Sequence, residues 1–159
     1  MAWAPCTTSV WLVIDPVEYR PLKTIELKMS KNNFFQDNSL NYIEMALRTD
    51  RIERLEQADG KSLKKGDCGD VVEFFILGSP DRIDTISFMV DGCMNTVACS
   101  NTVAEFAEGK SVDQAWDITP EQVIEYLETL DKDHHHCAEL SVGSFYLALS
   151  DLAPGTSKS

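Results

Sequence analysis

The stretch VVEFFILGSPDRIDTISFMV, residues 71–90, decides the fold of this chain. Residues 71–77 are dense in β-branched and aromatic side chains, which is typical of a half-buried strand. The GSPD sequence at residues 78–81 combines residue types that favour a turn. In residues 82–90, Ile86, Phe88 and Val90 alternate with more polar neighbours. The stretch therefore predicts an antiparallel β-hairpin.

The residues before the hairpin predict a helix and a short basic segment. Ser39 is a typical helix cap, and an apolar face at helical spacing follows it, formed by Leu40, Ile43 and Leu47. After an irregularity near residues 49–50, Ile52 and Leu55 extend this predicted face. Residues 62–67 are basic and bounded by glycine, which indicates a loop or an edge strand. Residues 32–38 are rich in Asn and Asp and predict a loop.

After the hairpin the apolar period changes, and the pattern predicts helices. The first carries Val97, Val103 and Ala107 and stops at Gly109. Capping boxes begin two further helices, with the pairs Ser111 and Gln114, then Thr119 and Gln122. We expect Asp133 to cap the last helix, and its predicted buried face consists of Ala138, Val142, Phe145, Leu149 and Leu152.

This order of elements predicts an α+β domain, with helices packed on a small antiparallel sheet of about three strands. We expect residues 39–153 to form this domain and residues 154–159 to be a polar tail. Residues 1–38 would be an N-terminal extension. It contains two strand-like patterns, residues 10–14 and residues 25–29, and no recognisable chemistry.

Composition narrows the class of protein. The chain has 159 residues, 43% of them hydrophobic, which suits one globular domain with a buried core. Its formal net charge of -12 repels phosphate backbones, so we expect no nucleic-acid partner. The strongly apolar run at residues 10–14 is far shorter than a membrane span, so we expect no membrane partner. No Lys or Arg precedes Arg20, which argues against a secretory signal, and we expect a cytoplasmic protein.

The five cysteines are Cys6, Cys68, Cys93, Cys99 and Cys137. An odd number in a chain expected to stay in the cytosol argues against a disulfide framework. The sequence contains no CxxC pair, which weakens zinc-ribbon and thioredoxin interpretations. The cysteines are therefore either buried as small apolar residues or gathered as ligands from distant segments.

Three short motifs combine residue types that bind metals. They are Cys68-Gly69-Asp70 at the start of a predicted strand, Gly92-Cys93 at a strand–helix junction, and His136-Cys137 in the first turn of a predicted helix. All three lie at the ends of elements, where side chains can converge at one rim of a sheet. Thiolates, imidazole and carboxylate hold iron–sulfur clusters or zinc. A helix N-terminus would also lower the pKa of the Cys137 thiol.

The order of motifs resembles the NifU N-terminal/IscU family of iron–sulfur cluster assembly scaffolds. The matching stretches are CGD at residues 68–70, DGC at 91–93, ACSNTVAEFAEGKS at 98–111, ITPEQV at 118–123 and HHHCAEL at 134–140. The resemblance is firm over residues 67–152 and looser back to Ser39. It does not cover residues 1–38.

The resemblance implies a function and a set of ligands. Cys68, Cys93 and Cys137 would hold a transient [2Fe-2S] cluster, and Asp70 and His136 would complete the metal site. Asp70 would keep the cluster labile. The chain would not be an enzyme: it would take sulfur from a cysteine desulfurase, bind iron and pass the cluster to apo-proteins. The same ligands often bind zinc in purified scaffolds of this kind.

Three features depart from the family pattern or fall outside it. IscU-type members carry Leu-Pro-Pro-Val-Lys before His-Cys, where a specialised chaperone binds; here residues 130–134 read LDKDH, so we do not expect that chaperone. Cys99 matches no family ligand and predicts a structural cysteine. Cys6 lies outside the resemblance and stays unassigned.

Two other metal-binding hypotheses remain open from the residues. A zinc ion on Cys68, Asp70, Cys93 and Cys137 could activate a thiolate as a sulfur acceptor, which would make the chain a sulfurtransferase partner of a desulfurase. Alternatively, a zinc ion could only lock the fold. A nucleotide site is rejected: Gly109-Lys110-Ser111 resembles the end of a P-loop, but Ala104 replaces its first glycine.

Overall fold

The computed structural model describes residues 33–152. The strands predicted within residues 1–32, the polar tail at residues 154–159 and Cys6 lie outside the described range. Where the sequence predicts a loop, the described part begins with a one-turn helix, α1 (Phe34–Asp37). Among the described residues, no helix combines the length and the apolar character that crossing a membrane requires.

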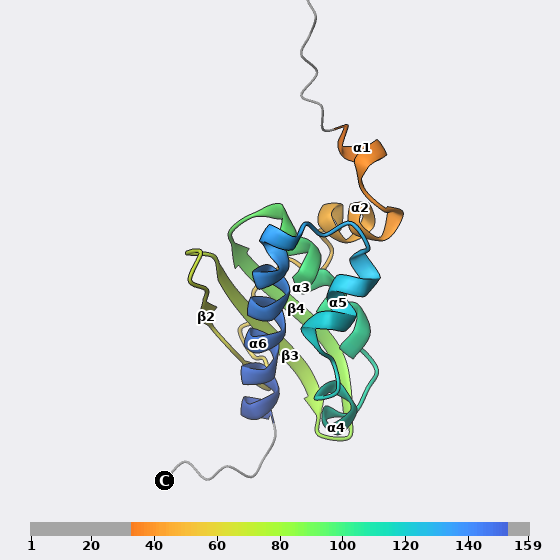
Figure 1. Ribbon diagram of the computed structural model, residues 1–159. Coiled ribbons are helices and arrows are strands. Elements are labelled where there is room, and N and C mark those ends of the chain that lie inside the picture. The colour runs from red at the N-terminus through yellow and green to blue at the C-terminus, as the bar shows by residue number, and fades with distance from the viewer. Residues whose placement is uncertain (1–32, 153–159) are drawn as a thin grey trace, which may run out of the picture. The chain divides into compact units, whose positions relative to one another are not determined.

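The predicted hairpin is confirmed and forms the centre of the sheet (Figure 1). Strands β3 (Val71–Ser79) and β4 (Arg82–Asp91) pair antiparallel, with a register shift at Leu77/Gly78. On the opposite edge of β3, two short strands pair antiparallel with it, β1 (Gly60–Lys61) and β2 (Lys64–Lys65). The basic segment, residues 62–67, thus contains one strand, β2, which continues the edge begun by β1. The four strands occupy three positions in the sheet.

The helices after the hairpin also follow the predicted signals. They are α3 (Met94–Ala107), α4 (Val112–Ala115), α5 (Pro120–Leu127) and α6 (His135–Leu152). Both predicted capping boxes are present, at the starts of α4 and α5. One cap is wrong: a 3-10 turn, Lys132–His134, precedes α6, and the Asp131 side chain caps that turn by accepting from the Asp133 amide.

The helix α2 (Leu40–Leu47) has its predicted Ser39 cap, but its predicted buried face is wrong. Leu40 is 83% exposed and Leu47 is 50% exposed, whereas the residues packed in the core are Tyr42, Met45 and Ala46. The helix also does not continue to Leu55. The helix ends before the predicted irregularity, the chain turns at residues 50–51, and Ile52 forms an isolated parallel bridge with Phe88 of β4.

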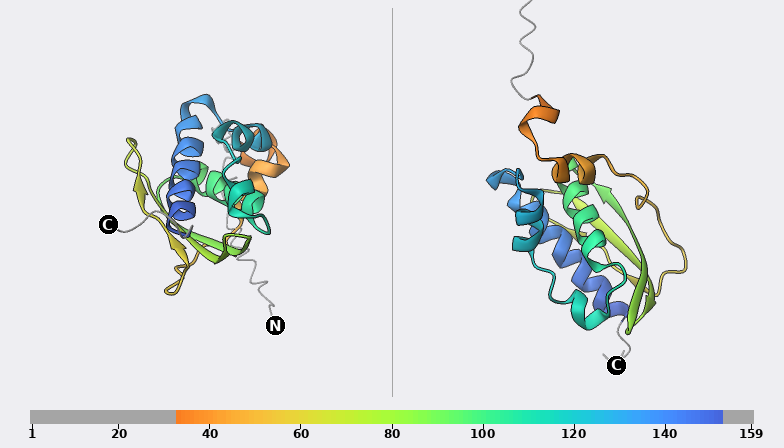
Figure 2. Two further views of the ribbon diagram at one scale, coloured as in Figure 1. Left: turned by 90° about the horizontal axis from the view of Figure 1, so that it is seen from below. Right: turned by 90° about the vertical axis from the view of Figure 1, so that its right-hand side faces the viewer.

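Helices α3 and α6 lie against one face of the sheet, as the two views in Figure 2 make clear. The core between these layers includes a cluster of aromatic rings from β3, β4 and α6: Phe74, Phe88 and Phe145. The predicted buried face of α6 is confirmed.

The pairing of Val71 with Asp91 places the start of β3 beside the end of β4. Helix α3 begins three residues after β4 ends. The segments that carry two of the three candidate motifs therefore meet at this end of the sheet.

Candidate metal centre

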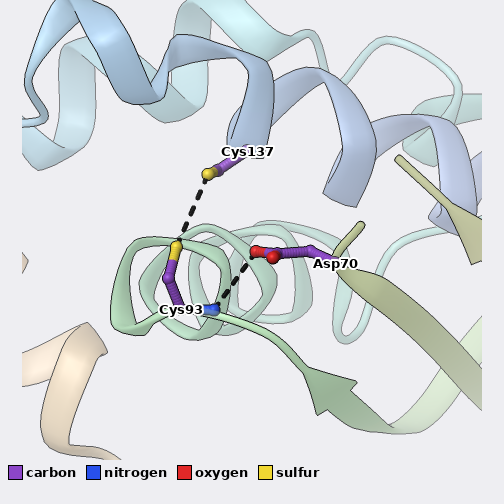
Figure 3. A group of neighbouring side chains, drawn as sticks. All are labelled: Asp70, Cys93 and Cys137. Carbon is purple, nitrogen blue, oxygen red and sulfur yellow. Dashed lines mark hydrogen bonds between the residues drawn. The ribbon is translucent and has the colours of Figure 1, made fainter. Parts of the chain in front are cut away.

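Three candidate ligands from separate elements meet at this end of the sheet (Figure 3). Asp70 directly precedes β3, Cys93 is the N-cap of α3, and Cys137 lies in the first turn of α6. The Cys93 and Cys137 sulfurs are 3.8 Å apart. One ligand atom from each of the three residues lies within 4.8 Å of the others. This is a geometry in which two thiolates and a carboxylate can share a metal ion.

The Asp70 carboxylate is held in place by two hydrogen bonds to the same oxygen. Oδ2 accepts from the Thr96 hydroxyl at 2.6 Å and from the Cys93 backbone amide at 3.1 Å. Burial raises the pKa of this carboxyl, but these hydrogen bonds to its charged form outweigh burial, so the net pKa lies below its ordinary value. Asp70 is therefore an ionised carboxylate with a fixed orientation.

Gly92 provides the space that Asp70 occupies. A Cβ atom at Gly92 would lie 2.5 Å from the Asp70 carboxylate, closer than real Cβ contacts allow. The side chain of any other residue here would force the carboxylate to move. The glycine before Cys93 is therefore part of the site's construction.

The predicted low pKa of the Cys137 thiol is wrong. Cys137 is fully buried, and burial raises the pKa of this thiol to about 12. The nearby Cys93 and Asp70 raise it further, because each disfavours a second negative charge. The sequence locates the first turn of α6, but the burial of Cys137 outweighs any benefit from the helix N-terminus.

His136 lies beside the group and Cys68 lies apart from it. The His136 Nε2 atom is 3.5 Å from the Cys137 sulfur. Cys68 is exposed and is not among the three converging ligands. It lines an open pocket of about 490 Å³ together with His136, Lys64 and Glu139. The structure thus brings together two of the three predicted cysteines.

The local backbone explains why Cys68 stays outside. Residues 66–69 form a turn in which the Gly69 amide donates to the Gly66 carbonyl at 3.0 Å. Gly69 has φ +94°, a conformation that favours glycine. This turn places Cys68 at the pocket and leaves Asp70, directly after it, beside Cys93.

Sequence reasoning missed Thr96, which is fully buried in the first turn of α3. Its hydroxyl contacts Asp70, and it also lies 3.5 Å from the Cys93 sulfur. Its spacing of three residues from Cys93 was an available signal, because such residues are neighbours on a helix. Cys99, predicted to be structural, is fully buried in the core, and burial raises the pKa of its thiol.

Known proteins with similar sequences are scaffolds of iron–sulfur cluster assembly. The iron-sulfur cluster assembly scaffold protein IscU 1 of Archaeoglobus fulgidus is 33% identical over 101 residues, which cover 63% of this chain and 66% of that protein. The scaffold protein IscU of Escherichia coli (strain K12) is 33% identical over 85 residues, 53% of this chain and 66% of that protein. The chain spans just under two thirds of the length of these relatives.

A solved structure and a family model agree with this likeness. The structure of a nitrogen-fixing NifU-like protein (N-terminal) from Brucella abortus has a TM-score of 0.60 at 16% identity, covering 72% of this chain and 92% of that chain. At this identity the likeness concerns the fold alone, and it agrees with the predicted α+β class. The model of the NifU-like N terminal domain matches residues 51–156, more than half of the sequence. The chain therefore belongs to the NifU-like N-terminal domain family, together with the IscU scaffold proteins.

Proposed function

We propose that this chain is an iron–sulfur cluster assembly scaffold that builds a transient [2Fe-2S] cluster and transfers it to apo-proteins. One observation carries the proposal: two cysteines separated by 44 residues lie with their sulfurs 3.8 Å apart beside a carboxylate. The NifU-like N-terminal domain family, to which the chain belongs, includes iron–sulfur cluster assembly scaffolds.

The donor set suits the proposed cargo. Thiolates are soft ligands that hold iron–sulfur clusters, whereas a carboxylate is a harder and weaker partner for such a cluster. Cys93 and Cys137 are the proposed inner ligands, and Asp70 is the proposed labile one. Loading iron releases the thiol protons, because a metal binds the thiolate.

Cys68 and His136 complete the proposed ligand set from the side of the pocket. Both line the same pocket, and His136 already contacts the Cys137 sulfur. Gly66 and Gly69 flank the turn that carries Cys68, and a Cβ at Gly69 would meet nothing within 4 Å. We propose that this turn rearranges during loading and brings the Cys68 sulfur to the cluster.

The proposed partners supply and receive sulfur and iron. A cysteine desulfurase delivers the sulfur, and apo iron–sulfur proteins receive the cluster. The specialised chaperone is not part of the proposal, because residues 130–134 lack its motif and include a 3-10 turn. Free thiols require a reducing compartment, so we propose the cytoplasm as the location.

Anaerobic reconstitution tests the function. The protein is incubated with Fe²⁺, cysteine, a desulfurase and a dithiol reductant, which supplies the electrons that reduce the persulfide sulfur to sulfide. Cluster formation is followed by visible absorption and by transfer to an apo-ferredoxin. We expect a coloured protein that activates the acceptor, and loss of that cluster in Cys68→Ser, Cys93→Ser and Cys137→Ser. Cys99→Ala is the matched control, since Cys99 is a buried core residue, and it should keep the cluster. A wild-type protein that stays colourless would refute the proposal.

The same experiment addresses the zinc-dependent sulfur acceptor, which the Asp70, Cys93 and Cys137 group would also suit. In that case the purified protein would retain zinc tightly and stimulate the desulfurase without forming a cluster. Metal analysis beside the reconstitution separates the two functions.

A further inference from the structure

Thr96 occupies a position from which it can control the carboxylate of the site. It is fully buried, one helical turn after Cys93, in the part of α3 that faces Asp70. Its hydroxyl oxygen is 2.6 Å from Asp70 Oδ2 and 3.5 Å from the Cys93 sulfur. A hydroxyl has one proton to donate, and the charged carboxylate at the shorter distance is the better acceptor.

The two hydrogen bonds to Asp70 make its two carboxylate oxygens different from each other. Oδ2 accepts from both Thr96 and the Cys93 amide, so its two in-plane lone pairs are engaged. Oδ1 takes no part in these hydrogen bonds. A metal ion that also binds Cys93 and Cys137 would therefore meet Asp70 through a single oxygen, with the other oxygen anchored to α3.

The backbone of Gly92 also packs closely against the Asp70 carboxylate. The Gly92 backbone lies so close to Asp70 that no Cβ atom would fit. Close contacts with Gly92 and Thr96 thus limit the rotation of the Asp70 carboxylate without any bond to the metal. Groups that orient a ligand in this way commonly set the affinity and exchange rate of metal sites.

We infer that Thr96 is a positioning residue of the metal centre, which fixes Asp70 as a one-oxygen ligand beside the two thiolates. The inference rests on the proposed function only in that Asp70, Cys93 and Cys137 bind the metal. Thr96 would thus determine metal affinity without binding the metal itself. The role belongs to the hydroxyl and not to the volume of the side chain.

A double-mutant cycle with Co²⁺ alone tests the inference. Co²⁺ affinity is measured by competition with a chelator, and the thiolate-to-cobalt absorption bands report the ligand set. We expect Thr96→Val, which keeps the shape of the side chain, to weaken binding about 10- to 100-fold. Thr96→Ser, which keeps the hydroxyl, should restore affinity to near the wild-type value.

The second half of the cycle separates positioning from packing. In the Asp70→Ala background, Thr96→Val should have no further effect, because the group through which Thr96 acts has been removed. An undiminished effect in that background would overturn the inference, as would wild-type affinity in Thr96→Val. Thr96→Ala replaces Thr96→Val in the cycle if the valine variant does not fold.

The outcome is independent of the cluster experiment. Coupling between Thr96 and Asp70 in a protein that never forms a cluster would refute the proposed function alone. Cluster assembly in a protein without that coupling would refute the positioning role alone.

Discussion

The Asp70 carboxylate accepts two internal hydrogen bonds and lies beside the sulfurs of Cys93 and Cys137. For a single divalent ion, Asp70 would be the third ligand beside the two thiolates. For a sulfur-bridged cluster it is the weakest point of attachment, where an incoming thiolate can replace it. We therefore propose that Asp70 would make the cluster easier to release from a scaffold.

Substitution of Asp70 tests this role. Asp70→Ala should keep a reconstituted cluster several-fold longer than the wild type, because the exchangeable oxygen ligand is gone. The variant should stay folded, at a cost of about 1–3 kcal/mol for the Cys93 amide and Thr96 hydroxyl left without their acceptor. The measurement is the decay of visible absorption in the presence of a chelator. Asp67→Ala, an exposed neighbour in the same turn, is the control. Faster decay in Asp70→Ala would contradict the assigned role.

The buried thiol of Cys137 predicts a stability that depends on pH. Its pKa is about 12 in the folded protein and about 8.5 in an unfolded chain. Below pH 8.5 both states hold the proton, and the full stability is present. As the pH rises towards 12, only the unfolded state releases the proton, so the free energy of unfolding of the metal-free protein falls.

Urea unfolding at pH 7.5 and pH 9.5 measures this effect. Cys137→Ala should lose less stability than the wild type over this interval, by about 1 kcal/mol. Equal losses in the two proteins would show that the thiol does not titrate as the structure predicts.

The sequence identified the ligand types at single positions more readily than their surroundings. Residue type and position at the ends of elements made Asp70, Cys93 and Cys137 candidates, and the resemblance to the NifU N-terminal/IscU family implied that they are ligands. The raised pKa of Cys137 could not be predicted, because burial depends on which residues cover α6. Thr96 was missed: its spacing indicates that it neighbours Cys93 on a helix, but not that its hydroxyl contacts Asp70, which comes from another element.

At the scale of elements, the accuracy of prediction followed the specificity of the local signal. The hairpin and both capping boxes were predicted because turn and cap residues restrict the backbone directly. The buried face of α6 was predicted from the spacing of its apolar residues, although its cap was not. Helix α2 offers two apolar faces, and its leucines suggested the wrong one. Which face packs inward depends on α3 and α5, which contact α2 in the structure and lie far along the chain.

Gly92 and Gly109 flank α3, and we expect substitution by alanine to affect metal binding at the first and stability at the second. Gly92→Ala places a methyl group against the Asp70 carboxylate, so it should weaken Co²⁺ binding while the domain stays folded. Gly109→Ala adds a methyl group in open space but at φ +82°, so it should lower the free energy of unfolding by about 1 kcal/mol. Gly109→Ala should leave Co²⁺ binding unchanged. Chelator competition and urea unfolding on both variants measure the two effects, and a Gly92→Ala variant with wild-type affinity would contradict the packing argument.

Across residues 33–152, most of the hydrophobic core lies away from the candidate metal centre, although Cys137 belongs to both and Cys93 packs against the core. The buried apolar residues form one continuous cluster that joins the sheet to α2, α3, α5 and α6. The largest fully buried side chains, including Phe74, Phe88 and Phe145, lie in this cluster and not at the candidate metal centre. Burial of each such side chain contributes about 1.5–3 kcal/mol, so the core provides a driving force for folding that needs no metal.

Metal removal therefore distinguishes a scaffold from a domain that zinc locks together. After treatment with a chelator, the protein should keep its far-ultraviolet circular dichroism and a cooperative thermal transition, with a midpoint lowered only by the lost binding free energy. A closed structural zinc site predicts the opposite, since such domains unfold without their metal. Cys93→Ser provides the control, because it should remove binding without abolishing the transition. Unfolding of the metal-free wild type would assign the site to the fold, because a scaffold must survive the loss of the cluster that it gives away.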